Sequence, residues 1–386
     1  MTIHRRRNRD HRAGRRNAQR VVGALSVLAF VAAACGDDDD DTADTTAPAA
    51  TDAPAATDAP AATDAPAATD APAATDAPAA TDAPAATDAP AATDAPAAAP
   101  EKAEISLGIL PIADVAPIFI AIDQGFFADE GLTVTTEFAQ GGAATIPALA
   151  SGDLDIGFGA YPSFFNAVSQ GLPLKIISEA NRPAPLFAGL YSMPDSGIAT
   201  VADMAGKTVA VNTLNNVVQL AVQAQLEDAG LTLDDITLVE IPFPDMPATL
   251  ERGDVDVISV VEPFGSIARN TLEATLVIDM FANRMEDFPV AGFFVTDSFL
   301  ADNPNTVAAF IRAFNNAVEV ANSDPDAVPI ILPTYIETAT EESARALNYP
   351  LFVSGLDLEI LQTVPDFMVD AGILEAPIDV AEYVAG

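Results

Sequence analysis

The sequence lacks most of the residues on which common catalytic and metal sites depend. It has no tryptophan, one cysteine and two histidines among 386 residues. His4, His11 and Cys35 all lie near the amino terminus, so the rest of the chain holds neither residue type. This excludes a Ser/His/Asp triad, a Cys/His dyad and zinc bound by His or Cys in the body of the protein. One cysteine also excludes an intrachain disulfide, and without Trp a quaternary-ammonium cage would rely on Phe and Tyr.

Basic residues are scarce and unevenly placed. The chain has 17 Lys and Arg against 56 Asp and Glu, and eight of the basic residues lie within the first twenty positions. From Cys35 onward there remain nine basic (17 − 8) and 55 acidic (56 − 1) residues, a formal charge of −46. Because binding of phosphate backbones requires clustered Lys and Arg, nucleic acid is excluded as an expected partner.

The amino terminus has the pattern of an export signal. An Arg-rich segment over 1–20 is followed by apolar and small residues over 21–34, which end at Ala34-Cys35. Fourteen such residues are too few for a lasting membrane span, which needs about 20. The small residues before Cys35 resemble a lipobox, although Ala32 stands where Leu is usual. We therefore expect a lipoprotein signal peptide over 1–34 and acylation of Cys35, which would anchor the exported protein to the outer face of the cell membrane. Cleavage without acylation is the alternative.

A low-complexity segment follows over residues 35–103. It contains five consecutive aspartates and eight copies of Thr-Asp-Ala-Pro-Ala-Ala. Proline in every copy prevents a continuous helix, and there is no large apolar side chain to bury. The sequence predicts a disordered tether that could reach on the order of 200 Å at roughly 3.1 Å per residue. Consecutive carboxylates lack the alternating ligand spacing of a calcium loop, so we interpret the Asp run as solvated.

The rest of the chain has the pattern of an α/β protein. Alternating apolar residues over 105–109 predict a strand, and the 3.6-residue spacing over 217–224 predicts a helix. Another helix is expected to begin at Asn303-Pro304, with proline in its first turn. Strands that alternate with helices favour a mainly parallel sheet with helices against it.

An internal repeat divides this body into two similar halves. Each half has Asp-x-Gly-Leu-Thr, then Gly-Asp-x-Asp before a short apolar strand, then a residue followed by proline. The interval from Gly152 to Tyr161 equals that from Gly253 to Glu262, nine residues in each case. The pattern predicts helix, glycine, buried strand and new helix in both halves. The simpler interpretation is that any α/β chain repeats helix, glycine and strand.

In open α/β sheets, ligands bind at the carboxyl ends of the strands. Two facing lobes would place two such edges across a cleft. The residues expected there, together with one nearby cation, are Asp114, Gly141, Gly142, Ala143, Tyr161, Arg182, Asn212, Thr213, Asn215, Asn216, Glu262 and Phe264.

These candidates have structural roles as alternatives to binding. The glycine pair could present backbone N–H groups to an oxyanion at a helix that starts near Thr145, or form an ordinary loop. The asparagines and Thr213 could contact solute or cap the next helix. Tyr161 could stack on solute or fill the core.

The charged candidates favour one kind of solute. Glu262 suits an ammonium or amino-pyrimidine group and would repel nitrate, unless it only caps the following helix. Arg182 could pair with a sulfonate or carboxylate, or form a surface salt bridge. Together they indicate a zwitterionic or amine-bearing organic solute over a simple anion.

Several longer motifs resemble one family. The runs 117–127, Gly141-Gly142, 151–155 and 197–211 are similar to the solute-binding proteins of nitrate, sulfonate and taurine ABC importers, which include carriers of thiamine-pyrimidine precursors. The resemblance covers residues 104–386. It implies a two-lobed periplasmic-binding fold of type II, with lobe I over 104–191 and 289–386, lobe II over 192–288, and a ligand cleft between them.

The same resemblance implies a monomeric, non-catalytic receptor that delivers a small solute to a membrane permease and uses no cofactor or metal. Enzymes of pyrimidine synthesis related to the family depend on His and Cys, which this body lacks. Two alternatives remain open: a secreted enzyme that pairs Glu262 with Asp114 or Asp245, and a surface interaction module on a stalk.

Overall fold

A computed structural model of the chain describes residues 98–139 and 141–385. The predicted signal peptide, Cys35 and all of the predicted tether before residue 98 lie outside the described residues. Two sheets organise the described part of the chain. The first has the strand order β11-β4-β10-β3-β1-β2, and the second has the order β7-β6-β8-β5-β9.

The strands of both sheets are short and mostly buried. Their bounds are β1 Glu104–Ile109, β2 Thr133–Phe138, β3 Ile156–Ala160, β4 Leu174–Arg182, β5 Ala188–Ser192, β6 Thr208–Val211, β7 Thr237–Glu240, β8 Val257–Val261, β9 Thr275–Asp279, β10 Ala291–Thr296 and β11 Leu351–Phe352. The predicted strand over 105–109 is thus confirmed as β1.

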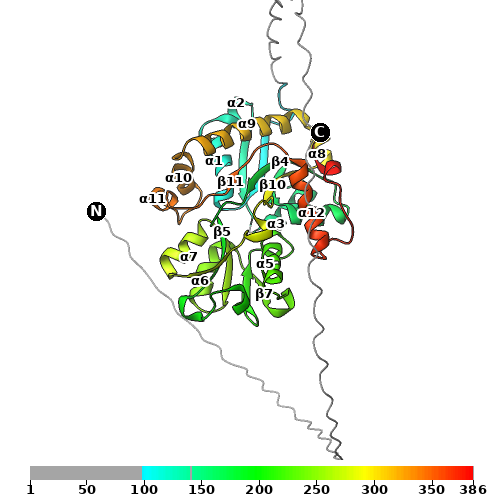
Figure 1. Cartoon of the computed structure of the whole chain (residues 1–386). Helices are drawn as coiled ribbons and strands as arrows, with labels where there is room; N and C mark the ends of the chain where they lie inside the picture. The colour runs from blue at the N-terminus through cyan, green and yellow to red at the C-terminus, as the bar shows by residue number, and fades with distance from the viewer. Residues whose placement is uncertain (1–97, 140, 386) are drawn as a thin grey trace, which may run out of the picture. The chain divides into compact units, whose positions relative to one another are not determined.

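Helices cover the faces of the two sheets. In Figure 1, α5, α6 and α7 lie around the second sheet, and α1, α2, α9 and α12 lie around the first. The helix bounds are α1 Ala116–Asp123, α2 Phe126–Asp129, α3 Gly142–Ser151, α4 Tyr161–Ser169, α5 Val217–Asp228, α6 Met246–Glu251, α7 Phe264–Leu272, α8 Asp297–Asp302, α9 Pro304–Ser323, α10 Ala327–Ile331, α11 Glu341–Ala344 and α12 Leu358–Asp370.

The two sheets are built in the same way, as the internal repeat predicts. β1 pairs in parallel with β2 and β3, and β6 pairs in parallel with β7 and β8. In each sheet the third parallel strand then pairs with an antiparallel strand, β3 with β10 and β8 with β5, so β1 and β6 lie centrally among the parallel strands. We call the part built on the first sheet lobe I and the part built on the second lobe II.

The antiparallel strands connect the lobes. The chain leaves β4 of lobe I, crosses at 183–187 and enters lobe II as β5. It returns through 280–290 and enters lobe I as β10. The sequence placed the boundary between the lobes at 191/192, near the end of β5. Because β5 pairs with β8 and β9 of the second sheet, the whole of β5 belongs to lobe II and the boundary lies before it.

The Gly-Asp-x-Asp motif has the same structural role in both lobes. The Asp155 carboxylate accepts a hydrogen bond from the Ser106 backbone N–H at 2.9 Å. The Asp256 carboxylate accepts one from the Thr208 N–H at 2.8 Å. In each lobe the aspartate thus satisfies a backbone donor near the start of the central strand, where the ladder leaves it unpaired.

Glycine precedes these aspartates because the chain turns sharply there. Gly152 caps α3 with φ of +80°, and Gly253 follows α6 with φ of +73°. Both values lie in the left-handed region, which glycine adopts at no steric cost.

The helix α3 begins earlier than expected. It starts at Gly142, with Gly141 as its N-cap, so Pro147 lies inside it. The expected start near Thr145 assumed that proline is confined to the first turn. Proline has no backbone N–H, so α3 lacks one backbone hydrogen bond at Pro147.

The long helix α9 packs against the sheet of lobe I. Pro304 stands at its first position as predicted, but the Asn303 side chain makes no capping bond to it. Phe310 and Phe314 pack edge-on against Phe293 of β10, with ring centroids 5.3 and 4.8 Å away. Each such buried ring contributes about 1.5–3 kcal/mol to stability.

The last residues of the predicted tether are bound to lobe I. The Glu101 carboxylate accepts the Thr306 N–H at 2.9 Å, and Lys102 pairs with Asp155 at 2.6 Å. Lys and Glu are common in disordered segments, so composition alone placed the end of the tether at residue 103, which is too late in the chain.

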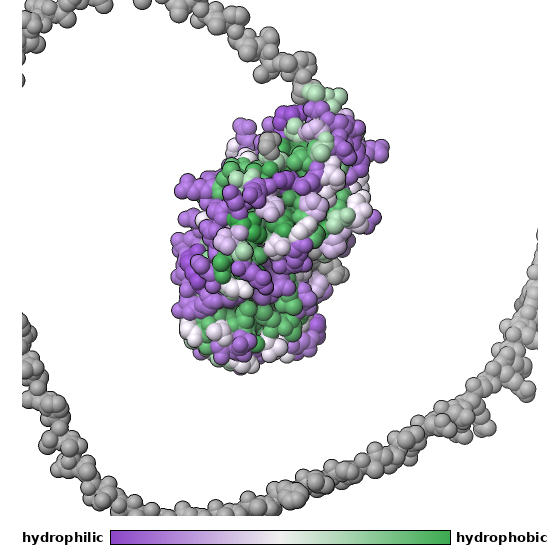
Figure 2. All heavy atoms as spheres, turned by 90° about the vertical axis from the view of Figure 1, so that its right-hand side faces the viewer, coloured by the Kyte–Doolittle hydropathy of each residue, from purple (hydrophilic) through white to green (hydrophobic). Residues whose placement is uncertain are grey.

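One face of the molecule is largely hydrophilic. Figure 2 shows the face at the right of Figure 1, where polar residues dominate and hydrophobic ones appear between them. Scattered exposed apolar residues are normal for a folded protein. Within residues 98–139 and 141–385, no helix combines the length and the hydrophobicity that a membrane crossing requires.

Candidate functional site

The carboxyl ends of four parallel strands meet between the lobes. They are the ends of β1 and β3 from lobe I and of β6 and β8 from lobe II. Residues at these ends enclose a cavity of about 40 Å³. It is lined by Leu110, Ile112, Asp114, Phe158, Ala160, Asn212, Asn216, Val217, Val218, Phe243, Val261, Val290 and Ala291. Three of these, Asp114, Asn212 and Asn216, are residues that the sequence predicted for the site.

Asp114 is the charged residue in this lining. It follows β1 in the short turn Ala113–Val115 and is 3% exposed. Its Oδ2 accepts a hydrogen bond from the Asn181 Nδ2 at 2.5 Å, whereas its Oδ1 has no partner in the described part of the chain. Burial raises the pKa of the Asp114 carboxyl from 3.8 to about 7, against the opposing effect of the Asn181 bond.

The asparagines at the start of α5 act partly as a cap. The Asn216 Oδ1 accepts the backbone N–H groups of Val218 and Gln219 at 3.0 and 3.3 Å. Its Nδ2 donates to Asn212 Oδ1 at 2.9 Å and to Thr213 Oγ1 at 2.6 Å. Two of the N-terminal N–H groups of α5 are thus satisfied by the Asn216 side chain, which is the capping role that the sequence left open.

Thr213 and Gly141 mark a close contact between the lobes. A Cβ placed on Gly141 would lie 2.3 Å from the Thr213 Cγ2, so only glycine fits in this arrangement. Gly142 and Ala143 form the first turn of α3 beside it. Asn215 lies apart from the cavity, in a separate hollow of about 240 Å³ that it shares with Pro147 and other residues of α3 and α4.

Glu262 is fully buried but points its charge into lobe II. Its Oε1 pairs with the Arg269 Nη2 at 2.6 Å, and its Oε2 accepts the Ser266 N–H at 2.9 Å. The Ser266 hydroxyl donates to Oε1 at 2.9 Å, and Arg269 also donates to Tyr191. The predicted capping role therefore describes this geometry, in which the Glu262 carboxylate is satisfied without a solute.

Tyr161 and Arg182 lie away from the cavity. The Tyr161 ring is fully buried against Phe165 and Phe294, and burial raises the pKa of its hydroxyl well above 10. Arg182 binds both carboxylate oxygens of the buried Glu179, at 2.5 and 3.0 Å. This bond raises the pKa of Arg182 and neutralises it as a partner for an anion.

A larger groove opens beside the cavity. It has a volume of about 570 Å³ and is walled by both lobes. Its lining residues are Pro111, Phe138, Pro244, Pro247, Ala248, Glu251, Phe264, Ile267, Thr271, Leu272, Tyr335, Ile336, Glu337 and Thr338. Of the predicted residues, Phe264 lies here.

The groove and the cavity share a wall. Phe264 of the groove stacks on Phe243 of the cavity, with ring centroids 6.3 Å apart. In lobe I, Pro111 faces the groove while its neighbours Leu110 and Ile112 line the cavity. Parting of the lobes at this wall would therefore join the two spaces.

Aromatic rings form one side of the groove. Phe119 lies between Tyr335 and Phe138, with ring centroids 3.9 Å and 6.3 Å away and nearly parallel planes. Phe138 is 52% exposed, although it is large and apolar. Such an exposed ring at the rim of a groove is typical of a binding surface.

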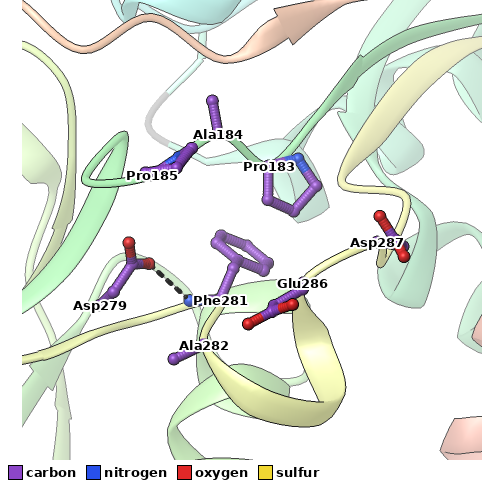
Figure 3. A pocket seen from close by; sticks show the side chains of 8 residues that line it. All are labelled: Pro183, Ala184, Pro185, Asp279, Phe281, Ala282, Glu286 and Asp287. Atoms are coloured by element: carbon purple, nitrogen blue, oxygen red, sulfur yellow. Dashed lines mark hydrogen bonds between the residues drawn. The ribbon is translucent and has the colours of Figure 1, made fainter.

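A third hollow lies on the two connections between the lobes. It has a volume of about 460 Å³, and Figure 3 shows the Phe281 ring in its middle, with Asp279 on one side and Glu286 and Asp287 on the other. The Asp279 carboxylate accepts the N–H of Leu186 at 2.7 Å and that of Phe281 at 3.1 Å. Asp279 thus ties one connection to the other, at a place that holds none of the predicted site residues.

Metal binding has no support in the described residues. Within 98–139 and 141–385, no three His, Cys, Asp or Glu side chains gather in a way that could hold a metal ion. The acidic residues of this hollow are included in that finding.

Sequence reasoning missed three aromatic residues of the cleft. Phe138 is the last residue of β2 and Phe243 comes shortly after β7, so the strand-end rule could have found both. Tyr335 reaches the groove from the distant carboxyl-terminal part of the chain, and no local signal marks it.

Comparisons with known proteins agree with this architecture. The family described as "NMT1/THI5 like" matches residues 112–328. The riboflavin-binding protein RibY of Chloroflexus aurantiacus is 26% identical over 308 residues, which are 73% of this chain and 84% of that protein. The 4-amino-5-hydroxymethyl-2-methylpyrimidine phosphate synthase of Aspergillus parasiticus is 26% identical over 225 residues, 55% of this chain and 64% of that enzyme. Binding proteins and an enzyme thus both occur among the relatives.

A solved structure has the same fold. The alkanesulfonate-binding protein SsuA from Xanthomonas axonopodis pv. citri, bound to MOPS, superposes with a TM-score of 0.64 at 18% identity. The match covers 74% of this chain and 99% of that protein. The predicted two-lobed periplasmic-binding fold is therefore confirmed.

Proposed function

The chain belongs to the NMT1/THI5-like family, and from this membership we infer that it is an extracytoplasmic solute receptor of an ABC importer. It closes its two lobes on a small organic molecule and delivers that molecule to a permease in the membrane. One observation carries this proposal: the carboxyl edges of two equivalently built sheets face each other and enclose a cavity. This is the place where open α/β sheets bind ligands.

Export and anchoring are part of the same proposal. The Arg-rich start, the apolar run and Cys35 support a lipoprotein, and the repeat segment supports a tether between the anchor and the lobes. Replacement Cys35→Ser should release the exported protein from the membrane fraction while it still binds solute. A variant that stays in the membrane fraction would contradict the lipid anchor but not the receptor.

Solute binding is tested by calorimetry with the full chain against sulfonates, amino-sulfonates, pyrimidines and nitrate. We expect one compound class to bind with a stoichiometry of one. If no member of the panel binds, and none stabilises the protein against heat, the receptor proposal fails.

Closure of the lobes can be tested at their tightest contact. Gly141→Ala would place a methyl group 2.3 Å from the Thr213 Cγ2, so the lobes could not approach fully. We expect a loss of affinity that the double variant Gly141→Ala/Thr213→Ser restores, because serine lacks the obstructing methyl group. An affinity that is unchanged in the single variant would show that binding does not need this closed arrangement.

A further inference from the structure

The cavity contains a buried carboxylate with an unused oxygen. Asp114 is 3% exposed, lines the cavity, and leaves Oδ1 without a hydrogen-bond partner among the described residues. An ionised carboxylate oxygen in such a place is costly unless a donor reaches it. A solute that brings an N–H group to this oxygen would remove that cost.

The charges around the cleft favour a cation over an anion. Asp114 is the charged residue in the cavity lining, and Glu251 and Glu337 are the charged residues in the groove lining. The nearby arginines are already paired, Arg182 with Glu179 and Arg269 with Glu262. A sulfonate or nitrate would thus meet carboxylates without a free guanidinium, whereas an ammonium group would gain a charge-assisted bond.

The sizes of the two spaces indicate how the rest of the solute would lie. A cavity of about 40 Å³ accommodates a small head group, since one water needs about 10–15 Å³. The adjoining groove of about 570 Å³ is walled mainly by aromatic, proline and aliphatic side chains. It suits an apolar or aromatic body.

We propose that the solute carries a protonated amine or amidinium that binds the Asp114 carboxylate, joined to an apolar or aromatic body that lies against Phe243, Phe264 and Phe138. This inference rests on the proposed receptor function, because it concerns the same cleft. It assigns to Asp114 the recognition of the cationic group and thereby separates this chain from receptors for simple anions.

The test uses probes that differ only in the head group. They are 2-phenylethylamine, 2-phenylethanol and 2-phenylethanesulfonate, and the corresponding amine, alcohol and sulfonate on a pyridine ring. Each is titrated by calorimetry into the full chain, into Asp114→Asn and into Asp245→Asn. Asp245 is a matched control, because it is an exposed carboxylate on the segment that carries Phe243.

We expect the amines to bind most tightly, and Asp114→Asn to weaken them at least about 30-fold, as loss of one partner of a buried charge pair does. Asp245→Asn should change the affinity less than about threefold. The alcohols should be affected much less by Asp114→Asn than the amines.

Several results would overturn the inference. Preference for the sulfonates, or equal loss of all three head groups in Asp114→Asn, would refute the role of Asp114 while leaving a receptor in place. Binding of none of the six probes would refute the aromatic-amine class, and the wider panel above would then decide separately whether the protein is a receptor. If Asp114→Asn fails to fold, the pH dependence of the wild-type affinity replaces it, and a flat profile for the amines refutes the inference.

Discussion

A buried carboxylate from each lobe lies in the region where the two sheets face each other. Asp114 of lobe I and Glu262 of lobe II are adjacent there, since the Ala113 N–H donates to the Glu262 carbonyl across the cleft at 3.2 Å. Glu262 is satisfied by Arg269 and Ser266 of its own lobe, but Asp114 keeps one oxygen unpartnered among the described residues. Burial alone therefore does not identify a binding group. A buried carboxylate whose oxygens all have protein partners has a structural role, whereas one with an unpartnered oxygen is a candidate to bind a solute.

The strongest test of this contrast is the replacement Glu262→Gln. Removal of the charge leaves the Arg269 guanidinium partly buried without its ion pair, and loss of one partner of such a pair costs about 3 kcal/mol. Urea denaturation should show this loss in the free energy of unfolding. Glu251→Gln, at an exposed carboxylate of the groove, should change it by less than about 0.5 kcal/mol. Similar values for the two variants would contradict the structural role of Glu262.

Asp114→Asn should have the opposite effect on stability. The pKa of Asp114 is raised in the folded state from 3.8 to about 7, so its contribution to stability is present below the unfolded value and is lost as pH rises through 7. Asparagine avoids that loss. We expect the variant to be more stable than the wild type by about 1–3 kcal/mol at pH 8 and by less at pH 5, since the shift corresponds to roughly 4 kcal/mol as an upper limit. A variant that is less stable at pH 8 would contradict the contrast with Glu262.

Affinity for an amine should also follow the titration of Asp114. Below its pKa of about 7 the carboxyl is protonated and loses its attraction for a cation, so the affinity for 2-phenylethylamine should fall about tenfold from pH 8 to pH 6. The groups around Asp114 are Asn181 on β4, the neutralised Arg182–Glu179 pair on the same strand, and Tyr335, whose pKa is raised well above 10 by burial. Calorimetry at both pH values checks the effect, and Asp114→Asn should show no such slope.

The smallest expected difference is the one between the aspartates that the two lobes share. Asp155 accepts the Ser106 N–H and hydroxyl and also pairs with Lys102, whereas Asp256 accepts the Thr208 N–H. Asp155→Ala should therefore lower the free energy of unfolding by about 2 kcal/mol and Asp256→Ala by about 1 kcal/mol. Urea denaturation of both variants measures the difference. Equal losses would mean that the Ser106 hydroxyl bond and the pair with Lys102 together add nothing.

The repeat was readable from the sequence because it depends on local chemistry. Gly152 and Gly253, the aspartates after them and the strands β3 and β8 follow from turn residues and apolar runs within one short segment. Parallel pairing then places the carboxyl ends of these strands at one edge of their own sheet. These features do not require knowledge of distant parts of the chain.

The roles of individual site residues were not readable in the same way. Tyr161 and Glu262 occupy equivalent places in the repeat, yet Tyr161 packs into the core against Phe294 of β10, and Glu262 pairs with Arg269 of the following helix α7. Whether Asp114 has a partner depends on Asn181, which lies on another strand. Contacts between residues far apart in the sequence are set by tertiary packing, so a local sequence pattern cannot predict them.

The aromatic side of the groove has a practical consequence for spectroscopy. The chain has five tyrosines and no tryptophan, so its ultraviolet emission has no indole component. Tyr335 lies in the groove wall and stacks on Phe119 with ring centroids 3.9 Å apart. An indole introduced by Phe138→Trp would be the sole emitter of its kind and would sit at the mouth between the lobes. The wavelength and intensity of its emission would then report opening and closing of the lobes in real time, without any attached dye.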